Sequence, residues 1–182
     1  MTSSKVAALT GKPGVGKTTA MIKVANLLTR DGVGLAGFYS REVRVKGIRV
    51  GFELVDIVSG DVYELAWAKQ GHGPRVGKYL VNIANVEKMA RQLVGEISGK
   101  CDAVLVDEVG PMELLSKGFV DAVETILHGG KPSLFTVHYA AKHPLVTKLK
   151  ELAGQYLFTL DFHNRDAIPG LVYSVMKGWL KD

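Results

Sequence analysis

The sequence predicts an α/β fold with a mostly parallel β-sheet. Short apolar runs alternate along the chain with amphipathic helical stretches, which is the order typical of parallel sheets. The first run, residues 6–10, is almost wholly apolar, as expected of a strand buried on both faces. Apolar residues then recur at the spacing i, i+3, i+4, i+7 from Met21 to Leu28, which predicts a helix over residues 18–30.

The same two patterns place the elements that follow. Apolar runs predict strands at 35–39, 103–106, 133–137 and 156–160. Helical spacing predicts helices at 86–97, 119–127, 143–152 and 171–180. Since 182 residues is the length of one ordinary domain, we expect residues 1–182 to form a single domain.

Residues 41–82 interrupt this alternation. Residues 42–46 and 48–54 alternate apolar and polar side chains, and Lys46-Gly47 between them favours a turn, so we expect an antiparallel hairpin with one face in solvent. A further strand at 62–66 and an edge strand at 78–82 are expected on either side of a glycine-rich loop. Because residues 41–82 are too few to bury a core of their own, we interpret them as an antiparallel β-hairpin region inserted in the same domain.

Composition excludes several classes of protein. Apolar residues make up 47% of the chain and charged residues 23%, which excludes collagen, a coiled coil and wholesale disorder. Cys101 is the single cysteine and cannot form an intramolecular disulfide, so we expect a core residue in a reducing compartment. No run of 18 apolar residues occurs, so we expect a cytoplasmic protein that does not span a membrane. The formal net charge of +5 suits an anionic ligand without identifying one.

One motif carries a specific chemistry. Residues 11–18, GKPGVGKT, match the phosphate-binding pattern G-x-x-x-x-G-K-[ST] without a mismatch. Its glycines allow a tight loop that turns backbone N–H groups inward, and the helix that follows adds its positive end. We expect Lys17 to reach the β- and γ-phosphates and the Thr18 hydroxyl to ligate Mg²⁺. The predicted nucleotide-binding residues are Gly11, Lys12, Pro13, Gly14, Val15, Gly16, Lys17, Thr18 and Thr19.

A second element is the acidic pair that ends a buried strand. Asp107 is poorly placed for the core but well placed for a metal at the carboxyl edge of the sheet. We predict that Asp107 holds Mg²⁺, directly or through water, and that Glu108 orients or deprotonates the attacking water. A solvated loop carboxylate or a helix cap is the alternative for Glu108. Together the two elements predict a three-layer P-loop NTPase.

The acidic pair also begins a longer signature. Residues 107–114, DEVGPMEL, resemble the D-E-[IV]-G-x-M-E-L signature of the THEP-type nucleoside-triphosphatases. Segments that agree in order are 37–39, 49–52, 75–79 and 164–166, so the resemblance covers nearly the whole chain. It implies a RecA-like P-loop sheet with β-hairpins, Mg²⁺ as cofactor, and slow hydrolysis of several nucleoside triphosphates.

Four further side chains are weaker candidates. His138 ends a strand whose Thr-x-His ending resembles a family strand, and it either senses the γ-phosphate or is structural. Arg165 follows the last strand and either packs on the base or stabilises transition-state charge; an ion pair or cap with Asp166 is the alternative. Arg75 and Lys78 either cover the phosphates, grip a second substrate or form a solvated rim. The predicted catalytic residues are Lys17, Glu108, His138 and Arg165.

The first functional hypothesis is Mg²⁺-dependent hydrolysis of ATP, GTP, CTP and UTP to diphosphate and phosphate. Broad base tolerance follows from the absence of a guanine-reading N-K-x-D motif. The alternatives are a nucleotide or small-molecule kinase with residual hydrolysis, and a nucleotide-gated switch that binds RNA or protein. Nucleic-acid binding through the basic hairpin is not favoured, because edge strands carry such charges to prevent aggregation and no aromatic residues are interleaved. The five histidines and one cysteine show no zinc-like spacing. The sequence predicts no particular oligomeric state.

Overall fold

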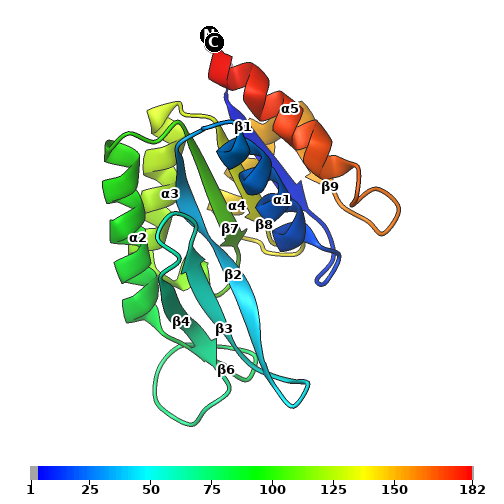
Figure 1. The fold of residues 1–182 in the computed structure, drawn as a ribbon. Helices are drawn as coiled ribbons and strands as arrows, with labels where there is room; N and C mark the ends of the chain where they lie inside the picture. The colour runs from blue at the N-terminus through cyan, green and yellow to red at the C-terminus, as the bar shows by residue number, and fades with distance from the viewer. Residues whose placement is uncertain (1–3, 182) are drawn as a thin grey trace.

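The computed structural model describes residues 4–181, and one nine-stranded sheet runs through this range in the order β5-β6-β4-β3-β2-β7-β8-β1-β9 (Figure 1). One half of the sheet is parallel. It consists of β2 (Leu35–Val45), β7 (Ala103–Val109), β8 (Ser133–Val137), β1 (Val6–Thr10) and β9 (Leu157–Thr159). The five strands predicted from apolar runs are confirmed, with β7 extending past residue 106 to include both acidic residues.

The other half of the sheet is antiparallel. It consists of β3 (Ile48–Asp56), β4 (Val62–Trp67), β6 (Tyr79–Val81) and β5 (Arg75–Val76). The described strands thus make four parallel and four antiparallel pairings, so the sheet is mixed, and the expected parallel character holds for one half. The strand expected at the edge, over 78–82, is not the edge, because the short β5 pairs outside β6.

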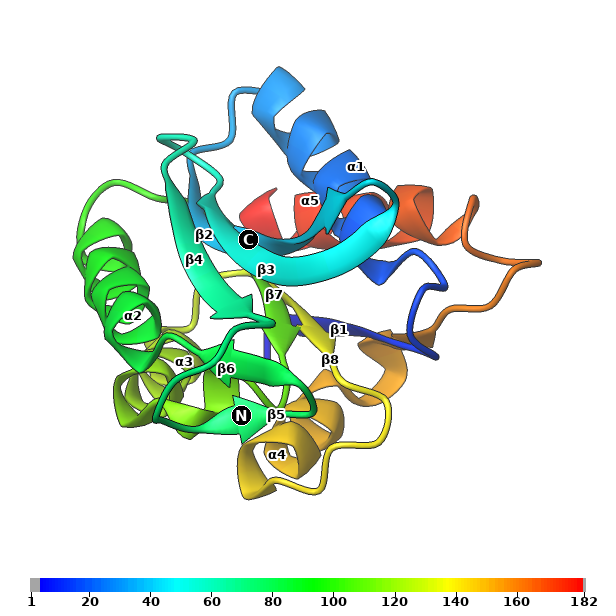
Figure 2. The same cartoon turned by 90° about the horizontal axis from the view of Figure 1, so that it is seen from below.

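The two halves share β2, which corrects the predicted boundary at residue 41. Residues 35–38 pair in parallel with β7, and residues 38–45 of the same strand pair antiparallel with β3. The sequence pattern changes at this point because the strand leaves the cover of the helices, so one face becomes exposed while the strand continues. Figure 2 shows β2 and β3 curving away together from the parallel strands.

Helices cover both faces of the parallel half and make a three-layer arrangement (Figures 1 and 2). One face carries α1 (Lys17–Arg30) and α5 (Ile168–Lys181), and the other carries α2 (Ile83–Ser98), α3 (Lys117–Gly129) and α4 (Pro144–Ala153). Side chains of β1 alternate between the two layers: Ala8 packs with the cluster that includes α2 and α3, whereas Ala7 and Leu9 pack with α1. The apolar runs of the sequence are therefore strands buried on both faces.

Local signals set the helix boundaries. The side chains of Asn82 and Ser116 accept from backbone N–H groups in the first turns of α2 and α3, at 3.1 Å and 3.0 Å. His143 acts in the same way for α4, since its Nδ1 accepts from the N–H of Leu145 at 3.1 Å, so the helix begins after residue 143. Cys101 is buried, as expected. Within residues 4–181, none of the helices combines the length and apolar character needed to cross a bilayer.

Candidate functional site

The loop between β1 and α1 has the conformation that its glycines permit. Gly14 and Gly16 have φ angles of 77° and 109°, in the region that favours glycine. Gly16 is the N-cap residue of α1 and has no side chain that could accept a hydrogen bond from the first turn. The first N–H groups of the helix therefore remain free to bind an anion. The Lys17 ammonium folds back over the loop and donates to the carbonyl oxygens of Gly11 at 2.9 Å and Lys12 at 3.3 Å. An ammonium has three donors, so one remains for a phosphate oxygen.

Asp107 lies at the centre of the site, with no exposed surface. Its Oδ2 accepts from the Thr18 hydroxyl at 2.8 Å and from the backbone N–H and hydroxyl of Ser40 at 3.1 Å and 3.2 Å. Its Oδ1 accepts from the hydroxyl of Thr136. Burial raises the pKa of Asp107, and these hydrogen bonds oppose the shift by favouring the carboxylate. The carboxylate thereby joins the P-loop helix to β2, β7 and β8.

The oxygen donors around Asp107 fit a Mg²⁺ ion. Mg²⁺ prefers oxygen ligands and is commonly held by one or two protein groups, with water and substrate phosphates completing its coordination. Thr18 and Asp107 supply a hydroxyl and a carboxylate in direct contact. In the described part of the chain, no group of three or more His, Cys, Asp or Glu side chains is arranged to hold a metal. The donor set therefore suits an ion that arrives with its nucleotide.

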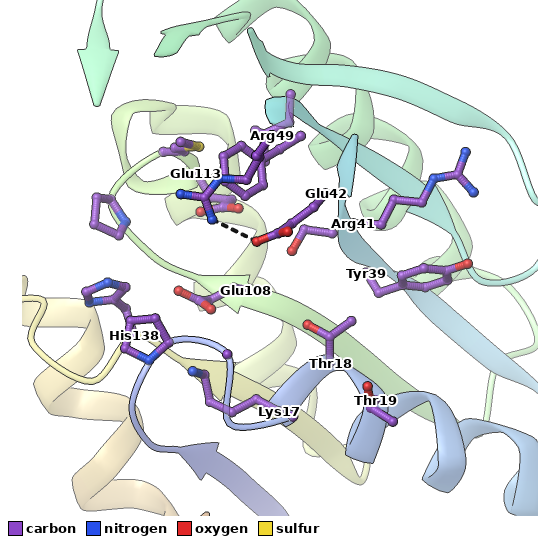
Figure 3. A pocket seen from close by; sticks show the side chains of 18 of the residues that line it. Lys17, Thr18, Thr19, Tyr39, Arg41, Glu42, Arg49, Glu108, Glu113 and His138 are labelled. Atoms are coloured by element: carbon purple, nitrogen blue, oxygen red, sulfur yellow. Dashed lines mark hydrogen bonds and ion pairs between the residues drawn. The ribbon is translucent and has the colours of Figure 1, made fainter. Parts of the chain in front are cut away.

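Glu108 faces the cavity beside the P-loop (Figure 3). Burial, followed by the charge of Asp107, raises the pKa of Glu108 to about 7, and Lys17 partly opposes the shift. A carboxyl group with this pKa exchanges protons near neutral pH, which suits a general base.

Glu113 is a second carboxyl group at the same place, and it is not among the site residues predicted from the sequence. It is buried in the short 3₁₀ helix Glu113–Leu115, where burial and the neighbouring Glu108 hold its pKa well above the ordinary value. A Cβ atom at Gly110 would lie 2.7 Å from Oε1 of Glu108 and 3.3 Å from Oε2 of Glu113, so the two carboxyl groups meet at this glycine. The available signal was a glutamate surrounded by apolar residues within the 107–114 signature.

The site opens into a cavity of about 610 Å³. The P-loop forms one wall, and the antiparallel half of the sheet forms another, as Figure 3 shows. That second wall includes Arg49 and Phe52, which lie in one of the segments that carries the resemblance. The sequence pattern of the inserted hairpin did not predict that it lines the site, although residues 49–52 belong to a segment that carries the resemblance.

His138 lies at the end of β8 and lines the cavity, half-buried. Its Nδ1 accepts from the N–H of Ala140 at 3.2 Å, which leaves Nε2 to carry the proton of a neutral ring. Burial, together with the charges of Lys17 and Lys150, lowers the pKa of His138 and favours that neutral ring. His138 can thus serve as a hydrogen-bond donor beside the P-loop.

Two of the predicted nucleotide-binding residues do not line the cavity. Seven do: Gly11, Pro13, Gly14, Gly16, Lys17, Thr18 and Thr19. The side chain of Val15 is buried in the core beneath the loop, and Lys12 is exposed, with only its carbonyl oxygen engaged by Lys17. The valine is present for packing, so its side chain is not a ligand contact.

The remaining cationic candidates lie outside the cavity. Arg165 is exposed, its guanidinium lies 5.1 Å from the centroid of the Phe162 ring, and its Cδ lies 3.8 Å from the position of a Cβ at Gly16. Among the described residues it is Lys23 that pairs with Asp166, at 3.7 Å. Arg165 is thus next to the P-loop but outside the cavity that Glu108 lines.

Arg75 and Lys78 are exposed on the inserted hairpin region and do not line the cavity. The Arg75 guanidinium donates to the carbonyl oxygens of Lys69, Gly71 and Lys78, at 2.9 to 3.3 Å. These bonds hold the glycine-rich loop in shape, which is a structural role. The Lys78 ammonium lies 5.4 Å from the centroid of the Tyr79 ring.

Comparison with known proteins gives concordant results. A family model described as "NTPase" matches residues 6–173. The chain is 41% identical to the "Nucleoside-triphosphatase THEP1" of Methanopyrus kandleri over 175 residues, which is 96% of each chain. It is 40% identical to the protein of the same name from Archaeoglobus fulgidus, over 94% of this chain and 98% of that one.

Two solved structures resemble the fold. The crystal structure of THEP1 from the hyperthermophile Aquifex aeolicus superposes with a TM-score of 0.78 at 30% identity, covering 94% of this chain and 98% of that one. The solution structure of a human cancer-related nucleoside triphosphatase gives a TM-score of 0.75 at 31% identity, covering 94% and 97%.

Proposed function

The chain belongs to the NTPase family and is a hydrolase of nucleoside triphosphates; from this premise we propose that it uses Mg²⁺ and converts ATP, GTP, CTP and UTP to diphosphate and phosphate. One observation carries the proposal: Lys17, Thr18 and Glu108 all line one cavity, and the Thr18 hydroxyl donates to the carboxylate of Asp107, which is buried behind it. A triphosphate bound in this cavity would contact Lys17 and the Mg²⁺ ion, and Glu108 would act as the base for the attacking water.

The P-loop binds the phosphates. Its backbone N–H groups and the open N-terminus of α1 favour negative charge, and the free donor of Lys17 extends this to the β- and γ-phosphates. Because Lys17 is buried and held by two carbonyl oxygens, it loses little conformational entropy on binding. Lys17→Ala removes both the positive charge and the hydrogen bonds that Lys17 donates to the carbonyl oxygens of Gly11 and Lys12.

Thr18 and Asp107 would hold the Mg²⁺ ion, which supplies positive charge to the phosphate oxygens when it is bound. Ser40 and Thr136 fix the orientation of the Asp107 carboxylate through the hydrogen bonds they donate. Neither of these two was among the sequence candidates, and we assign both a positioning role.

Glu108 acts on the water. As the water oxygen bonds to the γ-phosphorus, the bond from that phosphorus to the diphosphate oxygen breaks, and a proton of the water passes to the Glu108 carboxylate. The pKa of about 7 leaves a large share of Glu108 ionised at neutral pH. His138, neutral and beside Lys17, donates from Nε2 to a γ-phosphate oxygen.

We also propose that the fold is a RecA-like P-loop domain. A RecA-like P-loop domain has an additional strand beside the P-loop strand, and here β8 separates β1 from β7. A single continuous sheet supports treating the whole chain as one domain. Broad base tolerance rests on the missing N-K-x-D motif.

The test is phosphate release from each of the four triphosphates, with Mg²⁺ and with the metal chelated. We expect slow release from several triphosphates, none without Mg²⁺, and none from Lys17→Ala. Equal release from Lys17→Ala would identify a contaminating phosphatase. Tight triphosphate binding by the wild type without release would contradict the proposed hydrolysis.

A further inference from the structure

The cavity wall that faces the P-loop holds a fixed cation, Arg49. Its guanidinium carbon lies 5.0 Å from the centroid of the Phe52 ring and 5.5 Å from that of Tyr79. Its Nε donates to the Tyr79 hydroxyl at 2.8 Å. Two aromatic rings and a hydroxyl therefore fix the plane of this guanidinium before any ligand arrives.

Arg49 is paired with the carboxylate of Glu42, and the anionic group of a ligand can take the place of this carboxylate. Its Nη1 donates to Oε1 of Glu42 at 2.7 Å, while Arg44 donates to Oε2 of the same residue at 2.6 Å. The hydrogen bond from Arg49 is the main cause that lowers the pKa of Glu42, so the carboxylate is ionised. The Glu42 carboxylate therefore lies between two guanidinium groups, and a phosphate group favours the same environment. In the described part of the chain, Nη2 of Arg49 makes no hydrogen bond and remains available.

Arg49 differs from the other two arginines on this wall. Arg41 pairs with Glu53, and its side chain is 49% exposed. Arg44 is 54% exposed, and its Nη1 donates to the carbonyl oxygen of Gly47 in the hairpin turn. Arg49 is 40% exposed and is the one of the three that is stacked on rings. Figure 3 shows it extending into the cavity above Glu108, on the side opposite Lys17.

We propose that Arg49 is a further catalytic residue: it exchanges Glu42 for the γ-phosphoryl group and donates to its oxygens in the transition state. The inference rests on the proposed hydrolysis. During transfer, charge spreads over the three equatorial oxygens of the phosphoryl group, and Lys17 approaches from the P-loop side only. A planar guanidinium already held in place on the opposite side stabilises this charge with little reorganisation. It is supplied by the same chain, from the inserted hairpin.

The experiment compares steady-state kinetics of Arg49→Ala and Arg49→Lys with those of Lys78→Ala. Lys78 is a matched control because its ammonium lies against the same Tyr79 ring, outside the cavity. We expect Arg49→Ala to lower kcat about 100-fold or more and to change KM less than threefold, since the contact forms in the transition state. Arg49→Lys keeps the charge without the fork and should stay within tenfold of Arg49→Ala. Added guanidinium ion should restore part of the activity of Arg49→Ala, and Lys78→Ala should retain kcat.

Three results would overturn the inference while leaving the proposed hydrolysis intact: an unchanged kcat in both Arg49 variants, a rise in KM alone, or an equal loss in Lys78→Ala. The last would show that the wall is merely structural. Arg49→Lys alone carries the test if Arg49→Ala does not fold, as judged by its thermal unfolding. Absence of Mg²⁺-dependent phosphate release from the wild type would contradict the proposed function itself, and the Arg49 role with it.

Discussion

The raised pKa of Glu108 predicts how activity and stability both depend on pH. As a base, Glu108 must be ionised, and with a pKa of about 7 roughly half of it is ionised at pH 7. The ionised share falls to about one tenth at pH 6 and about one hundredth at pH 5, so kcat/KM should fall about tenfold per pH unit below 7 and level off above it. Glu108→Gln should lower kcat at least roughly 100-fold and abolish the part of the pH dependence that Glu108 causes.

The same group should destabilise the folded protein above neutral pH. Burial raises the pKa of Glu108 from 4.5 to about 7, so the ionised form is disfavoured in the folded state by about 3 kcal/mol as an upper limit. Below pH 4.5 the group is protonated in both states and the penalty is absent; it grows as the pH rises from 4.5 to 7 and is complete and constant above pH 7. Glu108→Gln should therefore raise the free energy of unfolding at pH 8 and leave it nearly unchanged at pH 4.

Two measurements check these expectations. The first is kcat/KM for hydrolysis of ATP in the presence of Mg²⁺, measured from pH 5.5 to 9. Glu108→Gln is measured in parallel as a control, because the terminal phosphate of ATP also titrates in this range. The second is urea unfolding of both proteins at pH 4 and pH 8. Wild-type turnover in Glu108→Gln would remove this residue from the mechanism. Parallel pH profiles of the two proteins would refute the reasoning from its pKa.

The remaining predictions concern backbone fit and the base. Gly37→Ala should destabilise the protein by more than about 3 kcal/mol in urea unfolding, because its Cβ would lie 1.8 Å from the carbonyl oxygen of Leu105 at a φ of 137°. Gly95→Ala is the matched control: it lies in α2, a Cβ there would have no atom within 4 Å, and alanine should stabilise the protein by about 0.5–1 kcal/mol. Similar unfolding midpoints for the two variants would contradict the packing argument. Arg165→Ala should raise KM several-fold and leave kcat nearly unchanged in steady-state assays, since Arg165 stacks with Phe162 outside the cavity and suits a base contact. A fall in kcat alone would instead indicate transition-state stabilisation by Arg165.

The sequence predicts the P-loop well because everything it needs is local. The positive φ angles of Gly14 and Gly16 and the start of α1 at Lys17 all follow from eight consecutive residues. The partners of Asp107 are of another kind: Ser40 lies 67 residues away in the chain and Thr136 lies 29 away. Only the parallel pairing of β2, β7 and β8 brings their hydroxyl groups to one carboxylate, and no spacing in the sequence encodes that convergence.

The inserted hairpin shows a different limit of sequence patterns. The change from a continuous apolar run to alternation near residue 40 was interpreted as the end of a strand, yet it marks a change of surroundings along one strand, β2. Periodicity reports which faces are covered, and it does not report whether hydrogen bonding to a neighbour continues. The same limit hid the cavity wall, because Arg49 lies on a face that alternation alone assigns to solvent.

The way the hairpin region is attached limits how the cavity can open. Leu54 and Leu65 are buried in the same core cluster as Met89 of α2, and β2 passes without a break from one half of the sheet into the other. A rigid-body swing of this region would expose these side chains to water, at about 25 cal/mol per Å² of apolar surface, and would disrupt the pairing of β2. Movement on ligand binding should therefore be confined to side chains and to the exposed turn between β2 and β3. Replacement of Glu42 by a phosphate group at Arg49 requires only side-chain movement. The substrate can therefore contact both the P-loop and the antiparallel half of the sheet without any opening of the sheet.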